Sequence, residues 1–234
     1  MARFALTWTH EGVPRAAEVA DGGSQIIGRD RAAAISIPIA TMSRQQARVY
    51  VDAGLCRLQN LSNTNPTRIN GVLADRPEAL ADGAAIEAGS VTLRFHDLAS
   101  RDQLQALVCS HCQRENAMRD SACWFCGTEL VNAPTAVYSV RRLLCRLVGA
   151  DGQAFDLMDG AALAVRDAGR IELVREAANA RAPAIVIAHG VAAFLPADDA
   201  RIESADGTTP VDHGRLRTGN LMVAGSRRYV VVAR

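Results

Sequence analysis

Four cysteines stand in two closely spaced pairs in the middle of the chain. Cys109 and Cys112 form one Cys-x-x-Cys pair, and Cys123 and Cys126 form a second pair ten residues further on. Two such knuckles converge naturally as four thiolates around one tetrahedral Zn²⁺ ion. Because a closed site of four cysteines leaves no coordination position for a substrate, the pattern predicts a structural zinc ion without catalysis.

Other uses of these cysteines fit the sequence less well. A redox-active pair would begin a helix within a βαβ unit, and two disulfides would suit a secreted chain, but neither context is visible. His111 lies inside the first knuckle and is expected to point outward and not to bind the metal. A segment of about twenty residues cannot build a core, so the metal would provide most of its stability.

The cysteine segment resembles the zinc-ribbon family in the form CxxCG…CxxCG-x-x-L. Its second knuckle continues as CGTEL, whereas the first glycine of the pattern is replaced by Gln113. Zinc ribbons bind nucleic acid or protein. The two arginines of this segment are too few to favour nucleic acid, whereas Trp124 and Phe125 could form an apolar protein-binding tip.

Length suggests about one to two domains, or three if some are small, and composition favours a soluble protein. The chain has 234 residues, 49% of them hydrophobic, and a formal net charge of +1. This charge gives no global field that would attract nucleic acid or an anionic membrane. We find neither a signal-peptide pattern nor a run of about eighteen apolar residues. Cys56 and Cys145 lie in apparent strands, where buried thiols are expected, so we predict a reducing, cytoplasmic compartment.

The regions on either side of the cysteines predict an all-β protein. Residues 3–98 contain short alternating runs separated by Gly- and Asn-bearing turns, a pattern typical of a β-sandwich or barrel. Residues 131–140 are expected to form a linker, and strand character returns from Leu143 onward. We therefore predict domains at 1–100, 105–132 and 137–234.

The third region repeats landmarks of the first, mostly at an interval of 137 residues. The paired stretches are Gly28-Arg29 with Val165-Arg166, Ser43-Arg44 with Ala180-Arg181, Asn70-Gly71 with Asp206-Gly207, and Gly83 and Gly89 with Gly214 and Gly219. Each match is weak alone. Their common order predicts two copies of one fold.

The stretch NLSNTNPTRINGV, residues 60–72, carries more small polar side chains than a turn requires. Asn70-Gly71 is explained as a two-residue hairpin turn, because both residues tolerate positive φ. Together with IIGRD and MSRQQARV, this stretch resembles the forkhead-associated (FHA) domain family. That family has a Gly-Arg after the second strand, a Ser-Arg-x-His loop and a Thr/Ser-Asn-Gly-Thr-x-x-Asn-Gly loop.

The resemblance covers most of residues 3–98 and implies an eleven-stranded β-sandwich whose loops at one end bind phosphothreonine in a partner protein. The binding positions that it implies are Arg29, Ser43, Arg44, Thr64 and Asn65. Their types suit the chemistry, since a phosphate group needs converging guanidinium and hydroxyl donors. The simpler alternative is that these side chains only cap turns.

This sequence departs from the family pattern at two positions. Gln46 replaces the histidine of Ser-Arg-x-His, and Pro66 replaces the glycine after the loop asparagine. Gln46 can take over some of the hydrogen bonding of a histidine. Pro66 fixes φ and lacks an N–H group, so the loop is expected to adopt a variant conformation. Neither change removes a phosphate donor.

The second copy retains the arginines but loses the neutral donors. Ser43 is matched by Ala180, Thr64 by Ala200 and Asn65 by Arg201. We therefore expect residues 137–234 to form a degenerate FHA-like domain that is a poorer phosphate site.

These features predict a non-enzymatic adaptor that recognises a threonine-phosphorylated protein of a serine/threonine kinase pathway. The alternative is a zinc-ribbon regulator that binds nucleic acid and uses the FHA fold as a protein-interaction scaffold. The absence of a basic stripe disfavours it. An enzyme is disfavoured because no nucleophile–base pair is evident and the five histidines form no catalytic pattern.

Overall fold

A computed structural model describes residues 3–20, 22–100, 103–139, 142–166, 169–179, 184–195, 197, 200–204, 210–211 and 213–234. The described residues confirm the all-β prediction. They form strands and one short 3₁₀ helix, η2 (Ala177–Asn179), and include no helix that could span a membrane. The chain divides into two compact units, one made of residues 1–98 with 143–234 and the other of residues 99–142.

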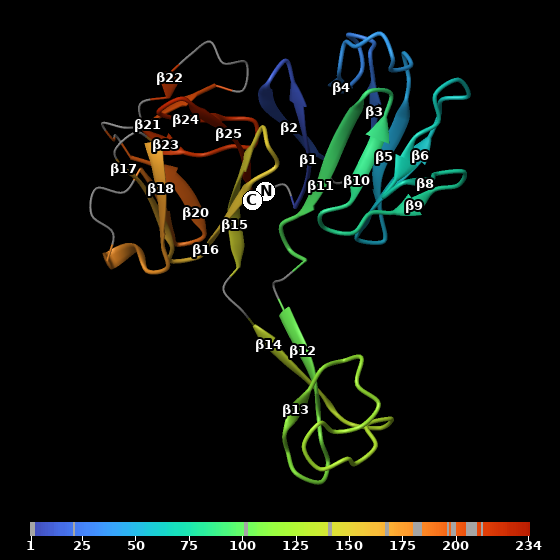
Figure 1. The fold of residues 1–234 in the computed structure, drawn as a ribbon, viewed down its shortest axis with the longest axis vertical. Helices are drawn as coiled ribbons and strands as arrows, with labels where there is room; N and C mark the ends of the chain where they lie inside the picture. Colours follow the sequence, from blue (N-terminus) through green and yellow to red (C-terminus); the bar gives the residue numbers. More distant parts are fainter. Residues whose placement is uncertain are drawn as a thin grey trace. The chain divides into compact units, whose positions relative to one another are not determined.

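Residues 3–98 form a sandwich of two sheets whose strands are mostly antiparallel (Figure 1). One sheet has the order β2-β1-β11-β10-β7-β8 and the other β4-β3-β5-β6-β9. The eleven strands agree with the sandwich that the sequence predicts. Their bounds are β1 (Phe4–His10), β2 (Val13–Val19), β3 (Ser24–Gly28), β4 (Ile35–Ser36), β5 (Ala47–Asp52), β6 (Leu55–Asn60), β7 (Arg68–Ile69), β8 (Val72–Leu73), β9 (Glu78–Ala79), β10 (Ala85–Ala88) and β11 (Val91–Asp97).

The core of this sandwich lies between its two sheets. Successive side chains of a strand point to opposite faces, so alternating apolar residues reach the same core. In β11, Leu93 and Phe95 are fully buried, and in β1 Phe4 and Leu6 are buried with them. Asn70-Gly71 forms the predicted tight turn, since both residues have positive φ and β7 pairs with β8 directly on either side.

Residues 143–234 repeat the same strand order with their own core. The sheets are β16-β15-β25-β24-β21-β22 and β18-β17-β19-β20-β23, which match the first sandwich strand for strand. One pairing differs, because β3 and β4 are parallel whereas β17 and β18 are antiparallel. The bounds are β15 (Leu143–Gly149), β16 (Ala154–Met158), β17 (Ala162–Arg166), β18 (Arg170–Val174), β19 (Ile185–Ala188), β20 (Val191–Phe194), β21 (Ala200–Glu203), β22 (Pro210–Val211), β23 (Gly214–Arg215), β24 (Leu221–Ala224) and β25 (Arg227–Ala233).

The structural repeat corrects the glycine landmarks. Gly83 donates its N–H to the carbonyl of Phe95, and Gly219 donates in the same way to Val231. Gly83 therefore corresponds to Gly219, and the prediction that it corresponds to Gly214 is wrong. The turn glycines before β11 and β25 are Gly89 and Gly225, both with positive φ. The predicted partners Asp206-Gly207 and Ala180-Arg181 lie outside the described residues.

The second unit carries the four cysteines and a three-stranded antiparallel sheet of order β13-β12-β14. Strand β12 (Gln103–Val108) pairs with β14 (Thr135–Ser139) on one side and with β13 (Glu115–Asn116) on the other. The prediction of a linker over residues 131–140 is therefore wrong in part, since most of its second half is strand. Its alternating small and apolar residues allow the pairing with β12.

Candidate functional site

Three loops of the first sandwich surround one hollow of about 630 Å³. The loop after β3 carries Arg29, the loop before β5 carries Ser43 and Arg44, and the loop after β6 carries Thr64 and Asn65. All five residues predicted to form a binding site line this hollow. The fold thus brings together residues that lie up to 36 positions apart in the sequence.

Gly28 allows the first two loops to approach each other. The N–H of Arg29 donates to the carbonyl of Ser43 at 3.0 Å. A Cβ atom on Gly28 would overlap the carbonyl oxygen of Arg44. Only glycine therefore permits this close contact. It brings the backbone of Arg29 next to the backbone of Ser43 and Arg44.

Gln46 connects the second loop to the third and is fully buried. Its Oε1 accepts a hydrogen bond from the Ser43 N–H at 2.9 Å, and its Nε2 donates to the Asn65 carbonyl at 2.6 Å and to Thr67 Oγ1 at 3.1 Å. Gln46 thus makes the structural hydrogen bonds that the sequence resemblance assigns to a histidine. It holds in place the backbone of two residues that line the hollow.

Asn60 and Ser62 also fix the loop after β6, although neither belongs to the predicted site. Asn60 Oδ1 accepts hydrogen bonds from the N–H groups of Ser62 and Thr67, at 3.2 and 3.1 Å. Ser62 Oγ lies 2.7 Å from Ser43 Oγ and accepts from the Asn65 N–H at 3.0 Å. The sequence signal for these anchors is the density of small polar residues in residues 60–72. Asn60 and Ser62 organise the loop through hydrogen bonds within the protein.

The hollow presents positive charge. Arg29 and Arg44 are both exposed, and within the described residues neither makes an ion pair. Thr64 is exposed beside them. One carboxylate, Asp30, also lines the hollow, and its Oδ1 accepts a hydrogen bond from the Ala32 N–H. The arrangement can offer two guanidinium groups and a hydroxyl donor to an anion.

Asn65 has a more restricted role than its type alone predicts. Its Nδ2 donates to the carbonyl of Thr41 at 2.9 Å, so the side-chain amide connects two loops of the sandwich. A second hollow of about 400 Å³ adjoins it, with Pro66 and Arg68 among its lining residues. Asn65 therefore stands between two depressions, a position suited to contact with an extended chain.

The second sandwich arranges the matched residues differently. Arg166 donates from Nε to Glu172 at 2.9 Å. The Ala184 N–H donates to the Leu163 carbonyl as the Gln46 N–H donates to the Ile27 carbonyl, so Val165 corresponds to Arg29 and the prediction that Arg166 does so is wrong. Arg201 pairs with Val223 of β24, as Arg68 pairs with Glu87 of β10. The prediction that Ala200 and Arg201 replace Thr64 and Asn65 is therefore wrong. They occupy a strand and not a loop.

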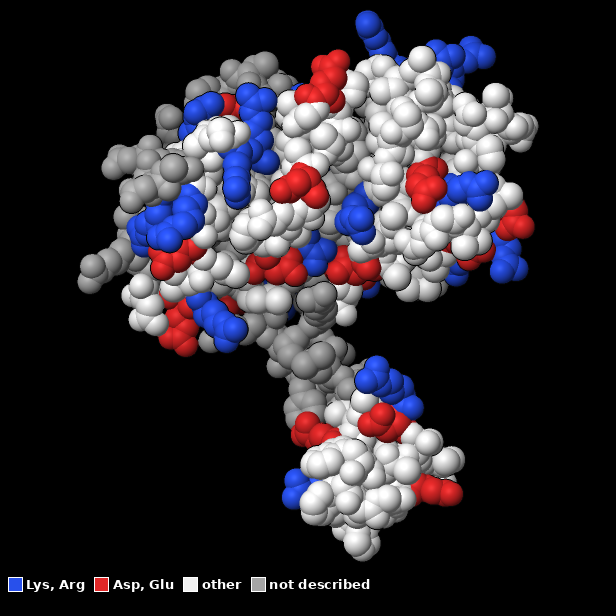
Figure 2. Space-filling model, viewed as in Figure 1, with Lys and Arg blue, Asp and Glu red and all other residues white. Residues whose placement is uncertain are grey.

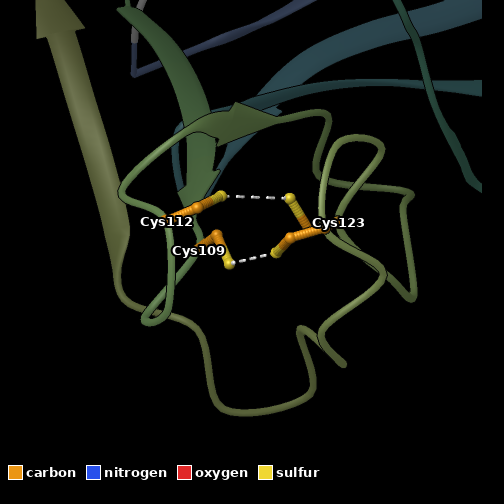
Figure 3. Close-up of side chains that lie close together, drawn as sticks. Cys109, Cys112 and Cys123 are labelled. Carbon is orange, nitrogen blue, oxygen red and sulfur yellow. Dashed lines mark hydrogen bonds between the residues drawn. The ribbon is translucent and has the colours of Figure 1, made fainter.

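The cysteines of the second unit form a compact cluster (Figure 3). The four Sγ atoms all lie within 4.8 Å of one another, with Cys109 to Cys126 and Cys112 to Cys123 both at 3.6 Å. Four sulfurs bound at about 2.3 Å to a tetrahedral Zn²⁺ would be roughly 3.8 Å apart. The cluster can hold a metal ion, and its all-thiolate donor set and spacing fit zinc.

The two knuckles have matching backbone geometry. The Gln113 N–H donates to the Cys109 carbonyl and the Gly127 N–H to the Cys123 carbonyl, each at 2.9 Å. Gln113 has φ 60° and Gly127 has φ 75°. Gln113 therefore adopts the left-handed conformation of the glycine that it replaces.

The surface next to the metal cluster is aromatic. Trp124 and Phe125 are 65% and 57% exposed, and the Arg114 guanidinium lies 3.9 Å from the Phe125 ring centroid. His111 is exposed, as the sequence predicts, and is not part of the metal cluster.

On the face of the molecule seen in Figure 2, basic and acidic side chains are interspersed.

The two remaining cysteines are buried within the sandwiches. Cys56 is 1% exposed and Cys145 is 0% exposed, as predicted. Burial raises the pKa of each thiol to about 12, with a smaller contribution from Asp97 for Cys56 and from Asp156 for Cys145. Neither thiol is therefore a reactive nucleophile.

Comparison with known proteins finds a similarity that is confined to the first sandwich. The family model of the FHA domain matches residues 26–89, which include all three loops around the hollow. A search of the curated proteins finds no match to the chain.

Solved structures similar to the chain include several FHA domains. One structure comes from a structural and functional analysis of phosphothreonine-dependent FHA domain interactions. Its chain is 28% identical to this one, the match covers 40% of this chain and 94% of that chain, and the TM-score is 0.37. The FHA domain of CT664 protein from Chlamydia trachomatis is 19% identical over 41% of this chain and 98% of its own, with a TM-score of 0.39. An FHA domain of an Arabidopsis thaliana hypothetical protein is 26% identical over 40% of this chain and 84% of its own, with a TM-score of 0.36.

Proposed function

We propose that the first sandwich binds phosphothreonine peptides through Arg29, Ser43, Arg44, Thr64 and Asn65. The observation that carries the proposal is the convergence of these five residues on one hollow within the segment that matches the FHA family model. Arg29 and Arg44 would neutralise the phosphate, and the hydroxyls would bind its remaining oxygens. Asn65, next to the second hollow, would contact the peptide backbone.

The charge of the hollow supports an anionic ligand. An arginine that already pairs with a carboxylate must lose that partner before it binds phosphate. Within the described residues Arg29 and Arg44 have no such partner. The buried Gln46 holds the loops before the ligand arrives, so less ordering entropy is lost on binding.

In this proposal the protein is a non-enzymatic, cytoplasmic adaptor whose partner is phosphorylated by a serine/threonine kinase. The described site contains donors for a phosphate but no candidate nucleophile beside a general base. The second sandwich would be a degenerate FHA-like domain that does not bind phosphopeptide. Its Arg166 is already paired with Glu172.

The test is a phosphopeptide array followed by titration of the best peptide against the full chain. We expect binding of the phosphothreonine peptide and none of the unphosphorylated form. Arg29→Ala should weaken binding about tenfold to a hundredfold, because one charge-assisted hydrogen bond contributes about 1.5–3 kcal/mol. Arg76→Ala is the matched control, since Arg76 is an exposed arginine paired with Glu78 away from the hollow. An array without a binder, or equal effects of the two substitutions, would refute the site.

We further propose that Cys109, Cys112, Cys123 and Cys126 hold one structural zinc ion in a zinc ribbon. The support is the sulfur geometry and the small apolar cluster around it, whose buried members are Cys109, Cys123 and Leu130. When bound, zinc would replace the missing core. Elemental analysis of protein purified without added metal should find one zinc per chain, and Cys123→Ser should lower that content. A folded, reduced protein without zinc would contradict the proposal.

A further inference from the structure

The two sandwiches of the first unit share a buried contact in addition to their separate cores. The contact is an apolar cluster from both sandwiches, and strand β2 of the first lies against β25 of the second. Its buried members are Ala5, Leu98, Leu143, Val148, Leu221, Val230 and Val232. These side chains lie on the outward faces of β1, β15, β24 and β25, or just beyond the strand ends, since the alternate residues fill the cores.

A single arginine is buried in this contact. Cys145 and Leu147 of β15 point into the core of the second sandwich, so Arg146 between them points out of it toward the first. Arg146 is only 6% exposed. Its guanidinium binds Asp156 of its own sandwich through Nε at 2.6 Å and through Nη2 at 3.1 Å.

The first sandwich supplies the other partners of Arg146. Nη1 donates to Asp82 Oδ1 at 3.0 Å and lies 3.0 Å from His96 Nδ1. A guanidinium can only donate, so His96 Nδ1 must be the acceptor, which places the ring proton on Nε2. Nε2 then donates to Thr7 Oγ1 at 2.8 Å. Asp82 is positioned in turn by the Asp97 N–H, which donates to Oδ1 at 3.1 Å.

We propose that this Arg146 cluster makes the second sandwich a permanent intramolecular partner of the first. The two sandwiches then form one structural unit that does not come apart. The apolar side chains supply most of the attraction. The arginine selects the partner, because a buried guanidinium is costly unless all its donors are satisfied.

The two sandwiches contribute different groups to the cluster, and this difference determines which surfaces can pair. The arginine comes from the second sandwich, and Asp82 and His96 come from the first. In the first sandwich the residue opposite His96 on β1 is Ala5, whereas in the second the residue opposite Arg146 on β25 is Val232. Two first sandwiches would bring acceptors together without a donor, and two second sandwiches would bring two arginines together. Only the unlike pair satisfies every group.

The test is to cut the chain between the sandwiches and ask whether they stay together. A recognition sequence for a site-specific protease is inserted after Ser100, which is exposed. After cleavage, residues 1–100 and the remainder should co-elute from a size-exclusion column at the mass of one intact chain. They should still do so in 1 M salt, since buried ion pairs are screened weakly. Separate elution, or a larger assembly, would overturn the proposal.

Two substitutions test the role of the cluster itself. Arg146→Met and Asp82→Asn should each raise the dissociation constant of the cut fragments at least tenfold. Asp82→Asn keeps an acceptor for the Asp97 N–H and so decides the question if Arg146→Met fails to fold. Arg166→Met is the matched control, because Arg166 forms a partly exposed pair with Glu172 within the second sandwich. Unchanged association of the cut Asp82→Asn protein would show that the cluster does not select the partner.

Discussion

The two sandwiches have the same framework but bury different polar groups. Their strand orders match throughout, and each buries its own apolar core. Among the described residues, the first sandwich buries five polar side chains, whereas the second buries only Arg146. The polar set of the first sandwich is Thr7, Gln46, Ser62, Thr67 and His96.

These buried polar groups mark what each sandwich does beyond folding. Gln46, Ser62 and Thr67 connect the loops of the candidate phosphopeptide site. Thr7 and His96 take part in the contact with the second sandwich, and Arg146 is the complementary group. An apolar core suffices for the fold, while the costly burial of polar groups occurs where a particular geometry must be held.

The largest expected effect on stability comes from removing Gln46, whose hydrogen bonds connect the loops of the first sandwich. Gln46→Ala would leave the Ser43 N–H without its acceptor, and the Asn65 carbonyl and Thr67 hydroxyl without their donor. We expect the free energy of unfolding to fall by about 2–4 kcal/mol, because unsatisfied buried polar groups cost about 1–3 kcal/mol each and water can enter to satisfy some of them. Urea denaturation measures this change, and phosphopeptide affinity should fall with it.

Two variants control for this effect. Gln153→Ala removes an exposed glutamine from a turn of the second sandwich and should change stability by less than about 0.5 kcal/mol. Gln46→His introduces the residue of the FHA pattern and should give an intermediate loss. If Gln46→Ala changed stability no more than Gln153→Ala, the buried network would not organise the loops.

The contact between the sandwiches should respond to pH at His96. Burial, and next the positive charge of Arg146, lower its pKa from 6.5 to about 4, with a further lowering from Arg94 and opposing effects of Asp82 and Asp156. A lowered pKa in the folded state means that the unfolded chain binds the proton first as the pH falls. The stability from neutral His96 is therefore complete above pH 6.5 and is lost as the pH falls to about 4. The loss is about 3 kcal/mol.

Denaturation curves between pH 7 and pH 4 measure this dependence. In His96→Gln the side-chain oxygen can still accept from Arg146 but does not titrate, so this part of the pH dependence should disappear. Asp82 contributes at lower pH. Burial raises the pKa of Asp82, but Arg146 and the Asp97 N–H together lower it by more, so the pKa in the folded protein lies below its ordinary value of 3.8. Its contribution to stability is therefore lost only as the pH falls below 3.8. An unchanged pH profile in His96→Gln would contradict the assigned neutral tautomer.

The sequence predicted the framework and the two groups of candidate residues better than the supporting contacts. The spacing of the four cysteines indicates their cluster, whereas the five candidate site residues follow from the resemblance to the FHA family, and the structure brings each set together. The sequence predicts the repeat, but glycines recur so often near its end that the spacing alone matches Gly83 wrongly with Gly214. Only hydrogen-bond register distinguishes Gly219 as the correct partner.

The Arg146 cluster could not be predicted from the strand pattern. In LLCRLVG, an arginine between two apolar residues looks like an ordinary solvent-facing position, since alternation shows which face of a strand is buried in its own sandwich. It does not show what covers the other face. Asp82 lies 64 residues away from Arg146, and no local pattern relates them.

The smallest predicted effect tests whether the repeated turns are energetically equivalent. Ala53-Gly54 connects β5 to β6 and His189-Gly190 connects β19 to β20, and all four residues have positive φ. Asn70-Gly71 has the same conformation with the preferred asparagine in the first position. The matching turns of the two sandwiches thus contain residues that tolerate this conformation less well.

Ala53→Asn and His189→Asn should therefore each stabilise the protein by about 0.5–1 kcal/mol. The expected gain is part of the roughly 1–2 kcal/mol that a left-handed conformation costs an ordinary L-residue, and asparagine recovers it by local hydrogen bonding. Ala53 should gain slightly more, because histidine is itself enriched at positive φ. In the opposite direction, Asn70→Ala should destabilise by more than either gain, since Asn70 Oδ1 also accepts from the Ala85 N–H at 2.9 Å. Thermal unfolding of the three variants measures these changes in stability. Opposite signs for Ala53→Asn and His189→Asn would show that the two hairpins share a conformation without sharing its energetics.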